Sequence, residues 1–381
     1  MAELEILNGV AEVPREAWNA LGQSSSPFLE WDWLASLEEA GTLGPESGWL
    51  SRPLVAREAG ELVAACPLYV KTNSDGEFVF DWGWADAAQS VGLRYFPKLF
   101  VGVPFTPVTG ARFLVAPGRD RGAWIERLGV ALRDLCLRQS FSSVHVCFCR
   151  RDELEALEKL GFLPRMGLQY HWKNTGFGSF EEFLARFRSK RRNQIRRERR
   201  ALAQAGIELE TWVGDAVTPE LASQLFELYR RNLSRQIYGR QYLNREFFEL
   251  LWERMRARLC VVVARRGKKT IAGALNLIQD DALYGRYWGS LEDVRYLHFN
   301  VCYYAGIEHC IDRGLPRFEP GAGGEFKRAR GFDPEPTWSA HFIADLPLRS
   351  AVGRFLTEER RAVERAVDWL RARSALKAAA D

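Results

Sequence analysis

A glycine-rich segment with both signs of charge occupies residues 320–332 and has the residue types that a group-transfer site needs. It reads Pro-Gly-Ala-Gly-Gly-Glu-Phe-Lys-Arg-Ala-Arg-Gly-Phe. Glycines let the backbone come close to a ligand, while Glu325 and the cations after it could move a proton and hold an anionic group. The segment is not a phosphate loop of the Gly-x4-Gly-Lys-Ser/Thr kind, because no hydroxyl residue and no helical pattern follow Lys327.

A second chemical feature is a run of cations. Residues 186–200 contain nine lysines and arginines and one acid, although the whole chain carries a net charge of only +4. Helix-forming residues continue through 180–205, so the sequence predicts one basic helix there. Such a charge density repels itself unless an anion lies against it, which favours a phosphate-containing partner. The other interpretation is a solvated helix that bridges two domains. The cations expected to bind a donor are Arg188, Lys190, Arg191, Arg192, Arg196 and Arg199.

The composition limits the class of protein. A chain of 381 residues has room for two domains, and 47% hydrophobic with 12% aromatic residues excludes wholesale disorder. No apolar run is long enough to span a bilayer, and the first residues have no signal-peptide pattern. Seven cysteines without a Cys-x-x-Cys pair and five histidines without ligand spacing indicate a reduced, cytoplasmic protein with no metal site.

The chain contains a diverged internal repeat. Leu54–Val70 and Val262–Ile278 each read as strand, polar turn and strand, at an offset of 208 residues. Each copy is followed by a further predicted strand, which ends in Trp82-Gly83 in the first half and in Trp288-Gly289 in the second. A nearly constant offset over three strands implies two similarly folded domains.

Helices and strands alternate after each repeat copy. The expected helices are 123–138, 152–160 and 300–313, and the expected strands are 143–149, 169–173 and one that starts at 317. This pattern predicts an α/β fold with mixed, mostly antiparallel sheets flanked by helices. The expected domains are 1–174, 175–345 with the basic helix 180–205, and a C-terminal helix at 346–381.

Several segments resemble the FemAB-like branch of the GNAT acyltransferase superfamily, a branch of predicted N-acyltransferases linked with peptidoglycan biosynthesis. The most specific are Phe28-x-x-Trp31-x-Trp33-Leu34, Phe80-Asp-Trp-x-Trp84, Val103–Val108, Lys190–Arg200, Gly285–Gly289, Leu297–Tyr304 and Glu319–Phe332. The resemblance implies two tandem GNAT-like domains that transfer an acyl or aminoacyl group to an amine. It implies no bound cofactor, with acyl-CoA or aminoacyl-tRNA as co-substrate and a peptidoglycan precursor among the amine acceptors.

The chain departs from the family pattern at two points of the loop. The family segment tends to read Gly-Ala-Gln-Gly-Glu-His-Lys, whereas Gly323 and Phe326 stand here at the Gln and His positions. The general base is then Glu325 or His298, or acts through water. The nearest match to the CoA signature, Arg119–Trp124, ends in the wrong residue, and 291–297 has no glycine. This favours aminoacyl-tRNA slightly as the donor.

We therefore expect the active site in the second half of the chain. The expected catalytic residues are Glu325, Lys327 and His298, and the expected substrate contacts are Arg328, Arg330, Tyr287, Trp288, Asn300, Gly321, Gly323 and Gly324. Lys327 or Arg330 would stabilise the oxyanion or hold a donor phosphate. Two of these assignments have an alternative without a function. Asn300 could instead be a helix N-cap, and Tyr287 and Trp288 could instead be residues of the hydrophobic core.

The first half has no counterpart of the glycine loop, so it is expected to be a substrate-binding or structural copy, with Asp81 as the next candidate for chemistry. The alternative for the whole chain is a non-catalytic protein of the same fold that recognises a cell-wall or nucleic-acid ligand. The sequence does not identify the acyl donor, the acceptor or the oligomeric state.

Overall fold

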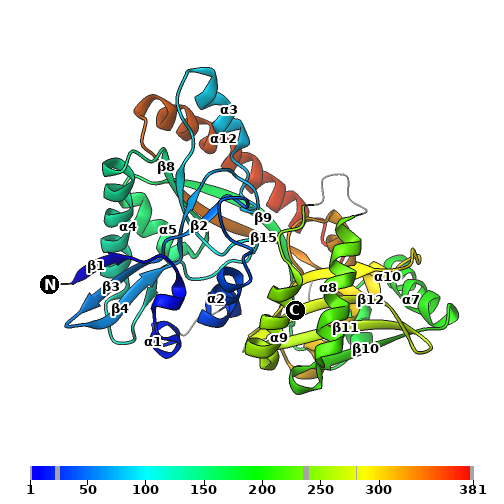
Figure 1. Cartoon of the computed structure of the whole chain (residues 1–381). Coiled ribbons are helices and arrows are strands. Elements are labelled where there is room, and N and C mark those ends of the chain that lie inside the picture. The colour runs from blue at the N-terminus through cyan, green and yellow to red at the C-terminus, as the bar shows by residue number, and fades with distance from the viewer. Residues whose placement is uncertain (1, 22–25, 235–239, 280, 378–381) are drawn as a thin grey trace. The chain divides into compact units, whose positions relative to one another are not determined.

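The computed structural model describes residues 2–21, 26–234, 240–279 and 281–377. The chain divides into two compact units (Figure 1). The first unit contains Met1–Leu168 and Pro336–Arg365, and the second contains Gln169–Glu335 and Ala366–Asp381. The boundary expected at 174/175 lies six residues after the boundary in the structure. The expected domain 175–345 and the expected separate C-terminal helix 346–381 also differ from the two units of the structure. Residues 336–365 belong to the first unit because Trp338–Ile343 pair with a strand of that unit and Val352 and Leu356 pack in its core.

The first unit contains two short sheets. One has the order β1-β3-β4-β7, from β1 (Glu3–Ile6), β3 (Leu54–Glu58), β4 (Glu61–Cys66) and β7 (Leu114–Val115). The other has the order β2-β5-β6-β8-β15, from β2 (Trp49–Ser51), β5 (Leu68–Lys71), β6 (Lys98–Val101), β8 (Ser143–Cys149) and β15 (Asp333–Ile343). Only β6 and β8 run parallel, and the other pairs are antiparallel.

Helices cover these sheets. They are α1 (Arg15–Ala20), α2 (Trp31–Glu39), α3 (Trp82–Ser90), α4 (Arg121–Arg138), α5 (Arg151–Lys159) and α12 (Leu346–Arg371), with short turns η1 (Val10–Glu12) and η2 (Pro27–Leu29). Asp120 caps α4 by accepting from Ala123 N, and Leu128 and Leu132 of α4 pack against Val144 and Val146 of β8. The predicted helices 123–138 and 152–160, the strand 143–149 and the C-terminal helix are therefore present. Among the described residues, no helix is long and apolar enough to cross a membrane.

The second unit is built on one mixed sheet. Its strands are β9 (Leu163–Lys173), β10 (Ile207–Val213), β11 (Leu259–Arg266), β12 (Lys269–Gln279), β13 (Ala282–Ser290) and β14 (Arg317–Glu319). The order is β10-β11-β12-β13-β14-β9, and only β13 and β14 run parallel. The helices are α6 (Phe180–Ala185), α7 (Ser189–Gln204), α8 (Pro219–Leu233), α9 (Arg245–Met255), α10 (Leu297–Phe299) and α11 (Ala305–Arg313), with η3 (Gly214–Ala216), η4 (Arg256–Arg258) and η6 (Glu325–Arg330).

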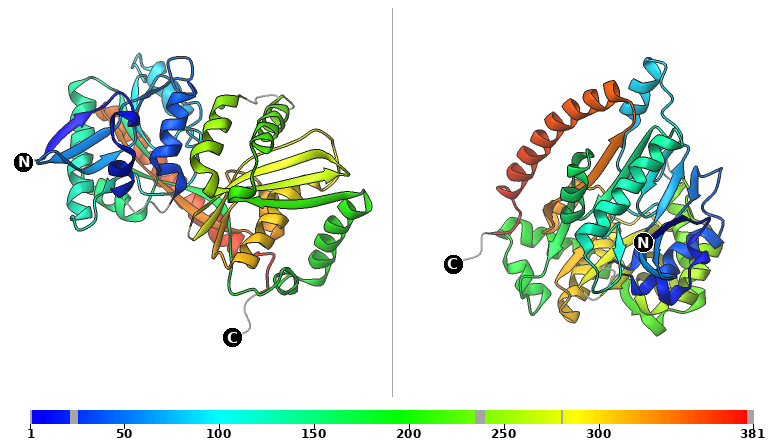
Figure 2. Two further views of the ribbon diagram at one scale, coloured as in Figure 1. Left: turned by 60° about the horizontal axis from the view of Figure 1, so that its bottom comes forward. Right: turned by 90° about the vertical axis from the view of Figure 1, so that its left-hand side faces the viewer.

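Helices cover both faces of this sheet (Figures 1 and 2). Tyr287 of β13 contacts Tyr229 of α8, with ring centroids 5.2 Å apart, whereas its neighbour Trp288 contacts His298 of α10 at 4.5 Å. Because successive side chains of a strand point to opposite faces, α8 and α10 lie on opposite sides of the sheet. Phe248 of α9 lies beside Tyr287, so α9 shares the α8 side.

The helix that follows β13 is continuous but irregular. A π-helical turn, η5 (Asn300–Tyr304), joins α10 to α11, and Gly314 ends the helix in the left-handed region at φ 66°. The prediction of 300–313 was correct except that the helix starts at Leu297. Asn300 is not an N-cap: it lies inside the helix, and its side-chain amide donates to the carbonyls of Glu198 (3.1 Å) and Tyr296 (2.9 Å).

The single basic helix expected at 180–205 was wrong, because the chain turns between α6 and α7. Phe187 lies in this turn and is fully buried, 5.1 Å from the ring of Phe183. The residue after Phe187, Arg188, has an extended backbone (φ −60°, ψ 147°), so one helix cannot continue through this point. The hydroxyl of Ser179 caps α6, and α7 is held on one side by buried Ile195 and Leu202.

The two repeat copies agree in their hairpins and differ afterwards. β3–β4 and β11–β12 carry the same register shift, at Ala56/Arg57 and at Ala264/Arg265. The expected third strand of the first copy is absent, because Trp82-Gly83 starts α3 while Trp288-Gly289 ends β13. The cause is tertiary: the chain just before α3 is tied to the sheet through the buried Asp81 carboxylate.

The two glycines of these Trp-Gly pairs should respond differently to alanine. A Cβ at Gly289 would lie 1.8 Å from the carbonyl oxygen of Leu228, so α8 must move, whereas nothing lies within 4 Å of a Cβ at Gly83. We expect Gly289→Ala to lower the free energy of unfolding by about 1–3 kcal/mol and Gly83→Ala to change it by less than about 0.5 kcal/mol. Urea unfolding of both variants checks this; equal effects would contradict the α8 packing.

Candidate functional site

The parallel strands β13 and β14 separate soon after they start. They pair over three positions, from Ala282–Arg317 to Tyr284–Glu319, after which β14 ends and β13 continues to Ser290. A bulge bends β13 here, since Leu275 of β12 pairs with Tyr287 and Asn276 pairs with Gly285. We call the space between residues 286–290 and the loop 320–324 the strand gap. An edge of this kind offers backbone N–H and C=O groups to an extended ligand.

The corresponding place in the first unit is occupied by the chain itself. β6 pairs in parallel with β8 up to Val101–Val146, and the insertion 102–113 then lies beside β8. Arg112 is almost fully buried there, and its Nε and Nη2 donate to the carbonyls of Cys147 (2.7 Å) and Val108 (2.6 Å). Gly110 N donates to Phe148 O at 3.1 Å. The first unit is thus closed where the second has its strand gap.

The glycine-rich loop leaves β14 at the strand gap. Gly321, Gly323 and Gly324 have φ of 85°, 69° and 86°, in the left-handed region that only glycine adopts readily. Lys327 is buried, and its Nζ donates to the carbonyls of Gly321 (2.5 Å) and Ala322 (3.1 Å). Burial lowers the pKa of Lys327 to about 8. The structure therefore places Lys327 as the brace of the loop, rather than as a side chain that reaches outward.

Glu325 and Phe326 lie at the outer turn of the loop, and both are exposed. Glu325 lies near Tyr170 of β9. Burial raises the pKa of Tyr170, and the negative charge of Glu325 raises it further. Among the described residues, no hydrogen bond joins Glu325 to Lys327 or His298. Two of the expected catalytic groups are nevertheless neighbours: the His298 pKa is lowered to about 4 by burial and then by the charges of Arg330 and Lys327. At neutral pH the His298 ring is uncharged.

Arg330 is buried in a network that the sequence did not indicate. Its Nη2 donates to both carboxylate oxygens of Glu198 (3.0 and 3.2 Å), and its guanidinium lies 3.2 Å from the ring centroid of Phe299. Glu198 also accepts from the Tyr304 hydroxyl and from Gln194 (2.9 Å). The one acid of the basic run thus fastens α7 to the loop and to the helix after β13, and Arg330 holds structure rather than substrate.

The expected donor-binding cations fall into two groups. Arg196 pairs with Glu181 at 2.5 Å, and Arg199 pairs with Glu308 at 2.8 Å while covering the Phe180 ring. Arg191 donates to the Gln194 side chain at 2.8 Å. Arg188, Lys190 and Arg192 have no carboxylate partner in the described part of the chain. Arg328 is half-buried, 5.5 Å from the Trp369 ring.

A buried acid at the end of β14 was missed. Glu319 is 4% exposed; its Oε1 lies 3.1 Å from Arg317 Nε, and its Oε2 lies 3.7 Å from His171 Nε2. Oε2 has no hydrogen-bond partner in the described residues. Burial, opposed by Arg317, raises the pKa of Glu319 to about 7. A glutamate that ends a buried strand just before a glycine loop was the signal available in the sequence.

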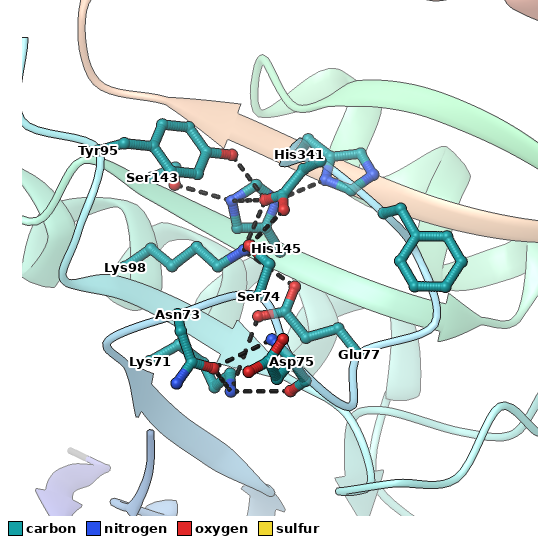
Figure 3. Close-up of polar contacts among 12 residues, drawn as sticks. Lys71, Asn73, Ser74, Asp75, Glu77, Tyr95, Lys98, Ser143, His145 and His341 are labelled. Atoms are coloured by element: carbon teal, nitrogen blue, oxygen red, sulfur yellow. Dashed lines mark hydrogen bonds and ion pairs between the residues drawn. The ribbon is translucent and has the colours of Figure 1, made fainter. Parts of the chain in front are cut away.

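Asp81, the first-unit candidate, belongs to a closed polar network, in which Figure 3 labels Lys98, Glu77, Ser74 and Tyr95. Lys98 Nζ donates to Asp81 (2.5 Å), Glu77 (2.9 Å) and Ser74 (3.0 Å), and the Tyr95 hydroxyl donates to Asp81 (2.6 Å). All five side chains are at least 95% buried. Burial alone would raise the pKa of Asp81, but Lys98 holds it well below its usual range. Asp81 therefore anchors the chain before α3.

The same network includes two histidines from neighbouring strands. His145 of β8 and His341 of β15 are paired residues whose Nδ1 atoms are 2.6 Å apart, so one ring donates to the other. Their Nε2 atoms reach Ser143 and Ser339, each at 2.8 Å. Burial lowers the pKa of both rings. Both are neutral core residues at physiological pH.

Two α/β units with mostly antiparallel sheets, helices on their faces and one parallel strand pair in each define a tandem GNAT-like fold. The sequence profile of the FemAB-like family, described as peptidoglycan biosynthesis/recognition, matches residues 9–378, and the chain belongs to this family. No curated protein sequence matches the chain significantly.

Solved structures agree with this fold. FemX aligns with a TM-score of 0.54 at 13% identity, over 92% of this chain and 100% of that one. A conserved protein of unknown function from Bacteroides thetaiotaomicron VPI-5482 gives 0.51 at 12% identity, over 89% and 100%. L-PGS from Bacillus licheniformis gives 0.50 at 11% identity, over 88% and 98%. At these identities the likeness shows the fold alone.

Proposed function

We propose that this protein is an N-acyltransferase whose reaction takes place at the strand gap of the second unit. One observation carries the proposal. β13 and β14 part after Tyr284 and Glu319, beside a loop of left-handed glycines, whereas the matching place in the first unit is filled around Arg112. An acyl chain needs a slot between strands, and we propose that the separation of β13 from β14 provides it. Membership of the FemAB-like family supports the transferase assignment.

The proposed donor is an aminoacyl-tRNA, with acyl-CoA as the other candidate. Arg188, Lys190 and Arg192 at the start of α7 are cations that no carboxylate neutralises in the described residues, and a phosphate backbone would do so. The poor match to the CoA pyrophosphate signature also favours the tRNA ester. The proposed acceptor is an amine, and the family description supports a peptidoglycan precursor.

The chemistry at the gap is displacement at a carbonyl. The amine attacks the donor carbonyl, whose oxygen gains negative charge, and backbone N–H groups of the free edge of β13 would stabilise that oxygen. The bulge at Gly285 and the Lys327 brace fix this edge and the loop before substrate binds. No charged side chain is required at the oxyanion, because backbone dipoles that are fixed in a site without water stabilise the negative charge as well.

The decisive experiment is a single-turnover transfer assay on the purified protein. Aminoacyl-tRNA and acyl-CoA are offered separately, with a peptidoglycan peptide precursor that has a free amine, and the product is detected by mass spectrometry. We expect the acceptor to gain the mass of the acyl group with one donor class. Donor binding without transfer would contradict the enzyme and support the alternative of a binding protein.

The tRNA proposal makes a separate prediction about α7. The variant with Arg188, Lys190 and Arg192 changed to Gln should bind tRNA more weakly, and the slope of log K against log salt should become shallower by about 2–3. The measurement is filter binding of tRNA across a salt series. A matched control removes three exposed cations of the first unit, Arg138, Arg354 and Arg361. Equal slopes for wild type and the α7 variant would remove α7 from donor binding.

A further inference from the structure

Glu319 lies at the closed end of the strand gap, as the last residue of β14 paired with β13. Its neighbour Phe318 packs with Leu283 and Ile307 in the core below the helix that follows β13. Because strand side chains alternate, Glu319 points to the opposite face, which α8 and α9 cover. Tyr287 lies on that same face, against Tyr229. An acceptor that reaches the gap from the α8 side would meet Glu319.

The surroundings of Glu319 leave one of its buried oxygens without a hydrogen-bond partner among the described residues. Arg317 approaches Oε1 at 3.1 Å and donates its Nη2 to the Tyr284 hydroxyl at 3.0 Å. Oε2 has only His171 near it, at 3.7 Å, and no hydrogen bond within the described chain. A buried carboxylate oxygen without a partner is costly. Such an oxygen at the end of a gap is explained by a ligand that donates a hydrogen bond to it.

We propose that Glu319 is the catalytic base, whose Oε2 takes a proton from the acceptor ammonium at the closed end of the strand gap. This inference rests on the proposed acyl transfer. The neutral nitrogen forms the C–N bond to the donor carbonyl, and the ester C–O or thioester C–S bond breaks. The nitrogen loses two protons in all: one passes through Glu319 to the leaving oxygen or sulfur, and the other is released to solvent.

The electrostatics fit a base that works near neutral pH. Burial raises the pKa of Glu319 to about 7, with Arg317 opposing, so the carboxylate has enough basicity to accept a proton and is still ionised above that pH. His171 stays neutral, because burial and the Arg317 charge lower its pKa to about 3. The charged groups that act on Glu319 or His171 are Arg317, Asp281, Glu335, Lys173 and Lys327.

Glu319 has two properties that Glu325, the base expected from the sequence, does not share. Glu325 is exposed on the outer turn of the loop, where water competes for every hydrogen bond. Glu319 is buried and adjoins the strand separation itself. General-base catalysis depends on a fixed distance between base and proton, which a buried side chain on a strand provides better than an exposed loop residue.

The test compares Glu319→Gln with wild type for two acceptors and one active donor. With the amine of a peptidoglycan peptide, kcat/KM should fall by about 10²–10⁴-fold. Wild-type kcat/KM should rise with pH and level off above about pH 7, because the base must be ionised. In Glu319→Gln this rise of kcat/KM with pH should be absent. With hydroxylamine, which is largely unprotonated at neutral pH, both proteins should react at similar rates, since no base is needed.

Glu210→Gln is the matched control, since Glu210 is a half-buried acid of the same unit that pairs with Arg265 at 3.0 Å and is not among the charges that act on Glu319 or His171; it should keep both the rate and the rise with pH. If Glu319→Gln keeps the amine rate and the rise with pH, Glu319 is not the base. If it loses the amine and hydroxylamine reactions equally, its role is structural and the proposal is wrong. If wild type transfers from neither donor, the acyltransferase function itself fails, a result distinct from either of these.

Discussion

Replacing Lys98 with methionine is expected to lower the free energy of unfolding by about 3–5 kcal/mol. The reason is that the Asp81 carboxylate would stay buried without its lysine partner and Glu77 would keep only Lys71, at 4.0 Å, while methionine fills most of the space. This loss of stability should become smaller as the pH falls, because the carboxylates left without Lys98 can then take up protons. A carboxyl group whose pKa is higher in the folded than in the unfolded state destabilises the folded protein least at low pH. Urea unfolding at several pH values measures both effects.

The control for this prediction is Lys159→Met, which removes an exposed cation of α5 in the same unit. Its expected effect is within about 0.5 kcal/mol. A Lys98→Met variant as stable as this control at neutral pH would mean that the buried charges are not held as the structure has them. The network would then have no role in fixing the chain before α3.

Breaking the buried pair between Arg330 and Glu198 is the second change expected to have a large effect. Arg330→Met should lower the free energy of unfolding by about 3–5 kcal/mol, because the Glu198 carboxylate keeps only Tyr304 and Gln194 as partners. It should also reduce acyl transfer, since the loop after β14 loses its attachment to α7. Thermal unfolding and the transfer assay are the two measurements.

A double-mutant cycle separates the pair from its surroundings. Changing both residues, Arg330→Met with Glu198→Leu, should recover most of the lost stability, since no unpaired charge is then buried. Arg328→Met, at a half-buried neighbour beside Trp369, serves as the single-site control and should cost less. If the double variant is as unstable as the sum of the two single ones, the two side chains do not interact as described.

The fold was predictable where local pattern and packing agree. The hairpins at Leu54–Val70 and Val262–Ile278 are periodic over many residues, and Gly314 ends a helix because it adopts φ 66°. The first Trp-Gly pair was misread as the end of a strand, whereas the second does lie at the end of β13, because identical dipeptides do not determine their own structure. Gly289 is fixed by the approach of Leu228 from α8, and Trp82-Gly83 is fixed by the neighbouring Asp81 network. Neither partner can be read from the dipeptide.

The site was only partly predictable. The glycines of the loop and its place after a strand were visible in the sequence. The roles of the charged residues were not, because each depends on a partner far along the chain. Lys327 is satisfied by carbonyls of its own loop, and Glu198 meets Arg330 across 132 positions. Glu319 is buried on a strand whose partner, β9, lies far back along the chain, with Phe318 opposite Trp172.

The path of the chain between the two units has a practical consequence for anyone who wishes to study them apart. β9 starts in the first unit and ends in the second, while β15 runs the other way and completes the sheet beside β8. A fragment that stops at residue 174 would lack β15, and β8, whose seven residues are all buried, would become an open apolar edge prone to aggregation. Isolating the first unit therefore calls for replacement of residues 169–335 by a linker that joins 168 to 336, rather than for a simple truncation.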